Sequence, residues 1–154
     1  MKKNIFTRNI CIGLVDGLTI PLALAAGLSG LVINSSSVII ACLVASLAGA
    51  MTMTIGGFFE SRKYAGSENP VVSAVTIGGG YFSGGMVATL PYFFHNDPMI
   101  ALCFSAIVTI AVLFIAGYWE SKLNGSNGWT NAVRVCVTGA VAACAAFFIG
   151  KLFR

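Results

Sequence analysis

The chain has 154 residues, of which 57% are hydrophobic and only 9% are charged. Soluble domains carry about 25% charged residues, so a water-soluble fold of this length has too few polar residues to cover its apolar surface. The sequence therefore predicts an all-α membrane protein in a lipid bilayer. The net charge of +4 is small and dispersed, so we expect no nucleic-acid partner.

Five apolar segments each approach the roughly 20 residues that a helix needs to cross a bilayer. We expect a single transmembrane domain over residues 1–154. Its five spans are predicted at approximately 9–32, 38–59, 71–93, 99–119 and 131–152.

Capping residues mark the predicted helix ends. The polar run from Asn34 to Ser37 can cap the second helix. Asn69 and Asp97 each precede a proline, which suits the first helical position because that position leaves its amide hydrogen unpaired. The turn-forming stretch 124–128 separates the fourth and fifth helices. These signals support the boundaries that hydropathy predicts.

Lysine and arginine are unevenly divided between the two predicted sides of the membrane. With the N-terminus inside, seven of the nine lie on the cytoplasmic side, and only Lys151 and Arg154 lie outside. Because positive residues are enriched on the cytoplasmic side, the sequence predicts an N-in, C-out topology. We expect a multi-pass protein of the plasma (inner) membrane of a prokaryote.

Asp16 is a carboxylate within the otherwise apolar first span, about 10 Å from its inner end at 1.5 Å per residue. Ionisable groups inside a membrane are costly and commonly serve ion passage or proton relay. Asp16 is therefore a candidate cation ligand or proton carrier, the alternative being a hydrogen bond to a neighbouring polar group. Pro21 leaves the carbonyl near Gly17 without its helical partner, which favours either a cation site or a simple kink.

The second span carries a stripe of four residues at spacings that share one helix face: Gly49, Met53, Gly56 and Glu60. The small residues let a neighbouring helix approach closely. Met53 offers a thioether and Glu60 a carboxylate at the cytoplasmic mouth. Mixed donors of this kind suit first-row divalent metals better than Ca²⁺ or Mg²⁺. The alternative for Met53 is a packing role.

Glu120 ends the fourth span in the same sequence pattern in which Glu60 ends the second. At the membrane interface it has three possible ion-pair partners, Arg62, Lys122 and Arg134. The chain contains no catalytic Ser/His/Asp set, no clustered metal motif and no phosphate loop. The sequence therefore predicts a protein that is not an enzyme and has no bound cofactor.

Several short motifs follow one another in order along the chain. They are Asp16-Gly17-Leu18 with Ala25-Ala26-Gly27, residues 49–56, Leu90-Pro91-Tyr92, residues 117–125, Arg134 and residues 139–143. In this order and spacing they resemble the vacuolar iron transporter family, also called the iron/manganese transporter family, over most of the chain.

The resemblance implies a five-span homodimer that exchanges Fe²⁺, and often Mn²⁺ or other divalent metals, for protons. Its path runs between the first helices of the two protomers. Carried over by position, Asp16 is the membrane carboxylate of the path and Met53 is its thioether.

Two departures from the family pattern affect this expectation. Gly57 stands where the family has a signature glutamate, and Glu60, one turn later on the same face, is the nearest carboxylate. Only residues 61–69 connect the second and third spans, where many members carry a glutamate-rich cytosolic metal-binding domain. The chain therefore resembles a short member without that domain. Val15 also replaces an asparagine of the family.

The leading hypothesis is a divalent metal antiporter that moves Fe²⁺ or Mn²⁺ out of the cytoplasm in exchange for protons. Its metal path consists of Asp16, Met53 and Glu60, with supporting positions at Gly56, Gly57, Pro21 and Glu120. The alternative is a structural or accessory membrane subunit that keeps the transporter fold without transporting. Transport of another solute through the same scaffold is a third possibility.

Overall fold

The computed structural model describes residues 2–31, 34–63, 69–123, 125 and 127–153. They form five helices: α1 (Lys2–Leu31), α2 (Ser35–Lys63), α3 (Pro70–Phe94), α4 (Pro98–Leu123) and α5 (Gly128–Leu152). All five are long and apolar enough to cross a membrane, which confirms the all-helical fold with five candidate spans. The helices extend beyond the spans predicted from sequence, most clearly at the start of α1. Hydropathy marks only the apolar part of a helix, whereas the backbone pattern continues into the polar ends.

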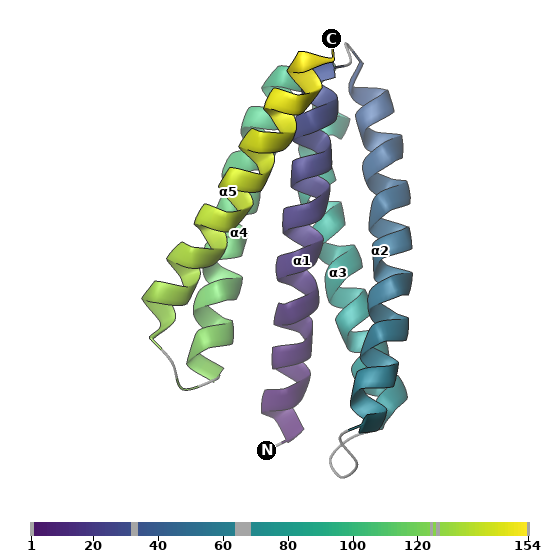
Figure 1. Cartoon of the computed structure of the whole chain (residues 1–154), viewed down its shortest axis with the longest axis vertical. Helices are drawn as coiled ribbons and strands as arrows, with labels where there is room; N and C mark the ends of the chain where they lie inside the picture. Colours follow the sequence, from purple (N-terminus) through teal and green to yellow (C-terminus); the bar gives the residue numbers. More distant parts are fainter. Residues whose placement is uncertain (1, 32–33, 64–68, 124, 126, 154) are drawn as a thin grey trace.

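Helix α1 occupies the middle of the bundle (Figure 1). In that view α3 lies behind α1 and α2, while α2 stands on one side of α1 and α4 and α5 stand on the other. Helix α1 contacts all four other helices, and α3 and α5 most extensively. The start of α1 lies at one end of the bundle together with the end of α2 and the start of α3 (Figure 1). We call this the N-terminal end.

Two predicted caps are present in the structure. The Asn69 side chain accepts a 3.2 Å hydrogen bond from the Val71 amide, and Asp97 accepts one of 2.8 Å from the Met99 amide. At the start of α2, the Ser35 hydroxyl donates instead to the Asn96 carbonyl at 3.0 Å, and so connects α2 to the segment before α4. Of the predicted turn before α5, Asn124 and Ser126 lie outside the described residues.

Glycines bring helix backbones together at two places. On α3, a Cβ at Gly84 would meet the backbone of Leu14, Gly17 and Leu18 at less than 3.0 Å. On α5, a Cβ at Gly150 would overlap the carbonyl oxygen of Gly27. Helices in lipid associate largely through such close packing, because the hydrophobic effect that drives soluble folding is missing there. These contacts fix α1 against α3 and α5.

Candidate functional site

A pocket of about 370 Å³ lies between α1, α2 and α3 at the N-terminal end of the bundle. We call it the Glu60 pocket. Five α2 residues line it: Met53, Gly56, Gly57, Glu60 and Ser61. The remaining lining residues are Arg8, Asn9 and Ile12 of α1 and Ser73 and Ile77 of α3. A polar pocket at the end of an otherwise apolar bundle is a place where an ion can leave water and enter the protein.

The predicted stripe on α2 reaches this pocket for three of its four members. Met53, Gly56 and Glu60 line it, because spacings of three and four residues bring side chains onto one helix face. Met53 is half-buried, whereas Glu60 is exposed at the open end. Gly49, the fourth member, lies against the ring of Tyr81 of α3. The structure thus brings the thioether and the carboxylate into one pocket.

The pocket also holds two polar residues that the sequence did not single out. Asn9 is buried, and its side-chain amide donates a 2.7 Å hydrogen bond to the Ser73 hydroxyl, which joins α1 to α3. Asn9 precedes Asp16 by seven residues, which is two helical turns, so the two lie on nearly the same face of α1. This seven-residue spacing from Asp16 is the feature of the sequence that could have indicated a role for Asn9. Ser73 carries no comparable signal, because its partner lies 64 residues away.

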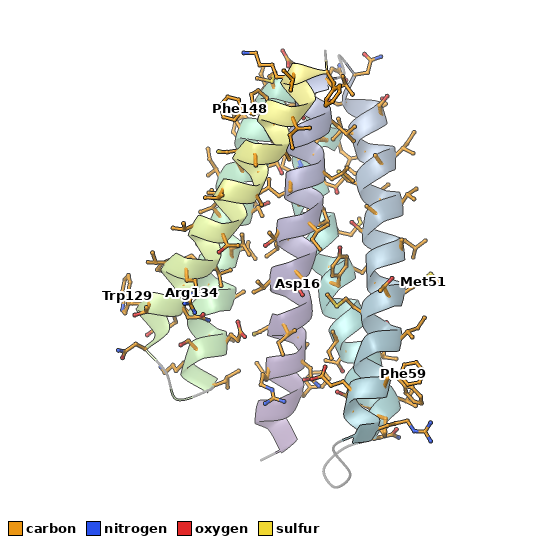
Figure 2. The ribbon with its side chains drawn as sticks, in the orientation of Figure 1. Asp16, Met51, Phe59, Trp129, Arg134 and Phe148 are labelled. Atoms are coloured by element: carbon orange, nitrogen blue, oxygen red, sulfur yellow. The ribbon has the colours of Figure 1, made fainter. Side chains whose placement is uncertain are left out.

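Asp16 lies about midway along α1 (Figure 2) and is half-buried. It does not line the Glu60 pocket, but Ile12, one helical turn closer to the N-terminal end, does. Among the described residues, no hydrogen bond or ion pair holds the Asp16 carboxylate. Its charge lies near the buried Tyr81 phenol of α3. Asp16 therefore lies further from the N-terminal end than the residues of α1 that line the pocket.

The supporting positions have different surroundings. Gly57 is buried, and a Cβ there would lie 2.9 Å from the Ile77 side chain. Pro21 is fully buried, and its carbonyl accepts a weak 3.7 Å contact from the Cys42 thiol. The carbonyl of Pro21 itself is a different group from the carbonyl near Gly17, which Pro21 leaves without its helical partner.

Glu120 is half-buried near the end of α4, and its charge lies near Cys11 of α1. Within the described part of the chain it forms no direct ion pair with Arg62, Lys122 or Arg134. It also does not line the Glu60 pocket.

No three His, Cys, Asp or Glu side chains gather into a metal-binding group anywhere in the described ranges. The donors in the Glu60 pocket are one thioether and one carboxylate, together with hydroxyl and amide groups. Structural metal sites in proteins commonly use four strong ligands. A site with fewer strong ligands is suited to a metal ion that binds reversibly.

Five helices long and apolar enough to span a membrane, with a polar pocket between three of them at one end, define a multi-pass membrane protein. The family model described as the VIT family matches residues 7–68 and 61–151. The chain belongs to the VIT family, whose members are transporters and not enzymes. This confirms the resemblance found in the sequence. In such a family a metal ion is the substrate and not a cofactor.

Named relatives align with nearly the whole chain. Protein CCC1 of Saccharomyces cerevisiae is 30% identical, over 94% of this chain and 68% of its own length. Vacuolar iron transporter 2 of Oryza sativa subsp. japonica is 29% identical, over 94% and 86%. Vacuolar iron transporter 1 of Arabidopsis thaliana is 29% identical, over 96% and 86%.

The relatives contain residues that this chain lacks. The alignment with CCC1 extends over 219 residues, whereas the chain has 154. The two segments matched by the family model meet around the connection between α2 and α3. That is the connection at which the sequence predicts a missing domain.

Proposed function

We propose that the protein transports a divalent transition metal, Fe²⁺ or Mn²⁺, out of the cytoplasm in exchange for protons. The observation that carries this proposal is the Glu60 pocket, which Met53 and Glu60 both line and whose α1 residue Ile12 lies one helical turn from Asp16. The printed names of the relatives from rice and Arabidopsis, vacuolar iron transporters, support it.

The geometry suggests a two-stage path. A metal ion first binds the Glu60 carboxylate at the open end of the bundle and then the Met53 sulfur, two helical turns further in. It then moves along the face of α1, past Ile12, to Asp16. An unpaired carboxylate in an apolar setting is costly, so each carboxylate along the path favours binding either a metal ion or a proton. Alternation between the two would couple metal movement to proton movement in the opposite direction.

The proposal includes an N-in, C-out topology, which places the Glu60 pocket toward the cytoplasm. It also includes a homodimer in which a second copy covers the Asp16 face of α1. An apolar side chain on that face, Ile20, is 51% exposed, which supports such a contact. We place the protein in the plasma membrane of a prokaryote, although the plant relatives are named vacuolar.

The test is Mn²⁺ flux into proteoliposomes with a pH indicator in the lumen. We expect Mn²⁺ entry to be accompanied by a change in lumenal pH, and an imposed pH gradient to accelerate it. Protein-free liposomes are the control. Mn²⁺ and Fe²⁺ flux no faster than in the control would contradict the proposal.

A second candidate is a non-transporting accessory subunit that keeps the fold. Gly57 in place of the family's glutamate favours it, as does the absence of a three-ligand metal group among the described residues. It predicts that the purified protein binds no Mn²⁺ and that another membrane protein copurifies with it. Stoichiometric Mn²⁺ on the purified protein would exclude this candidate.

Replacing Glu60 with glutamine should weaken Mn²⁺ binding at least about tenfold, because the pocket loses its carboxylate. Equilibrium dialysis on the purified protein measures the Kd. The matched control is Glu120→Gln, because Glu120 occupies the equivalent place on α4 but does not line the pocket. Equal losses in the two variants would show that the Glu60 pocket has no special role.

A second carboxylate position tests whether Glu60 replaces the glutamate of the family. Gly57→Glu in the Glu60→Gln background should restore part of the Mn²⁺ affinity, because both positions line the same pocket. The Ile77 side chain must move to make room, so we expect a stability loss of about 1 kcal/mol. Dialysis and thermal unfolding measure the two effects. If the folded double variant binds Mn²⁺ no more tightly than Glu60→Gln alone, Glu60 does not take the place of the family's glutamate.

A further inference from the structure

Arg134 is a charged residue on the exposed surface of a helix that is long and apolar enough to span a membrane. It lies six residues after Gly128, the first residue of α5, which is about 9 Å along the helix. Within the described part of the chain, Arg134 forms no ion pair with Glu120 or with any other carboxylate. A guanidinium exposed at this depth in a bilayer needs an anion or water from outside the chain.

Helix geometry directs the Arg134 side chain toward the nearer membrane surface. Side chains on a helix tilt toward its N-terminus, and α5 begins at the N-terminal end of the bundle (Figure 1). Thr130, one helical turn closer to that end, is also exposed. Its hydroxyl has no hydrogen-bond partner among the described residues. Thr130 and Arg134 thus present a free hydroxyl and a free cation on one exposed face of α5.

An exposed tryptophan marks the level of the membrane surface at this end. Trp129 is 69% exposed, and its ring packs edge-on against Phe114 and Tyr118 of α4. It points away from the bundle near the start of α5 (Figure 2). Exposed tryptophans gather at the headgroup level of a bilayer. Arg134, five residues further along α5, therefore lies about 7.5 Å closer to the apolar centre, a distance that a long arginine side chain can bridge.

We propose that Arg134 and Thr130 bind the phosphate of an anionic lipid from the leaflet at the N-terminal end of the bundle. The guanidinium can form two parallel hydrogen bonds to a phosphate, and the Thr130 hydroxyl adds a third donor. Arg62 and Lys122 are exposed cations near the same end, so a headgroup with a net negative charge is attracted more strongly than a zwitterionic one. Neither Arg134 nor Thr130 lines the Glu60 pocket, so this lipid site does not depend on metal transport.

The experiment measures Trp129 fluorescence in the full chain, reconstituted in phosphatidylcholine vesicles with a minor fraction of phosphatidylglycerol. The chain has two tryptophans, so a Trp119→Phe background leaves Trp129 as the sole reporter. Bromine atoms on acyl chains quench tryptophan at short range, and brominating each lipid in turn, at an equal fraction, shows which one lies beside it. We expect phosphatidylglycerol to be roughly fivefold enriched there relative to its share of the vesicle, the factor that one arginine near the surface contributes.

Variants in the same background assign this enrichment to the two residues. Arg134→Gln should abolish it, and Thr130→Val should lower it in part. Arg134→Lys should keep part of it, because it retains the charge but loses the paired hydrogen bonds. The control is Arg62→Gln, which removes the same charge near the same end of the bundle, from a guanidinium that lies 5.5 Å from the centre of the Phe58 ring. This control should quench like the wild type.

Three other outcomes would overturn the proposal. Equal quenching by the two brominated lipids would show that this face does not select an anionic lipid. Equal enrichment in Arg134→Gln and Arg62→Gln would show that Arg134 has no special part in it. Absence of quenching by either lipid would show that protein, such as a second copy of the chain, covers this face of α5. Helical content and monodispersity of each variant show that it is folded.

Discussion

Asp16→Asn should reduce proton-linked Mn²⁺ flux in proteoliposomes to the level of protein-free liposomes. The amide cannot carry the charge that attracts a metal ion and cannot exchange a proton for it. The substitution preserves size, and no hydrogen bond or ion pair to a described residue is lost. The protein should therefore remain folded while transport stops. The measurement is initial Mn²⁺ uptake together with lumenal pH.

Asp97→Asn is the matched control for this prediction. Asp97 lies outside the spans and caps α4, and asparagine is an equally good capping residue. We expect it to transport like the wild type, and Asp16→Glu to retain part of the flux because it keeps the charge. Wild-type flux in Asp16→Asn would show that the carboxylate does not take part, and the proposed coupling would then be wrong.

Gly84→Leu should cause the largest loss of stability of the changes considered, about 3 kcal/mol or more. Even a Cβ at this position would meet three backbone atoms of α1 at less than 3.0 Å, and backbone cannot move aside as a flexible side chain can. We expect α1 and α3 to separate and the purified protein to unfold at a much lower temperature. Thermal unfolding in detergent, followed by helical content and monodispersity, measures this change.

Gly79→Leu is the control on the same helix. A Cβ at Gly79 would meet nothing within 4 Å, so the side chain has room and faces outward. Leucine also has a higher helix propensity than glycine, so this variant should be at least as stable as the wild type. A similar Tm for the two leucine variants would show that the close α1–α3 contact does not govern stability.

The helices were predictable because each span is a long apolar run with recognisable ends. Asn69 and Asp97 form caps in the structure as their sequence context indicates. The longer extent of α1 was not predictable from hydropathy, because its first residues are polar and helical at once.

The sequence allowed us to predict only those groups of site residues that lie on one and the same helix. Helical spacing correctly grouped Met53 with Glu60, since both belong to α2. The contributions of Arg8, Asn9 and Ser73 depend on which helices lie side by side, and one sequence does not determine that arrangement. The separation of Asp16 from the pocket by one turn has the same origin, because it depends on how far α1 is shifted along α2.

The central place of α1 has a consequence for how the chain is assembled. Its most extensive contacts are with α3 and α5, which follow later in the sequence, and not with its neighbour α2. During synthesis α1 therefore enters the bilayer before its main packing partners, α3 and α5, have been made. Until they insert, Asp16 lacks the protein surroundings that it has in the complete bundle. A chain truncated before α5 would leave α1 without one of its two most extensive helix contacts. We expect cellular quality control to remove such a fragment.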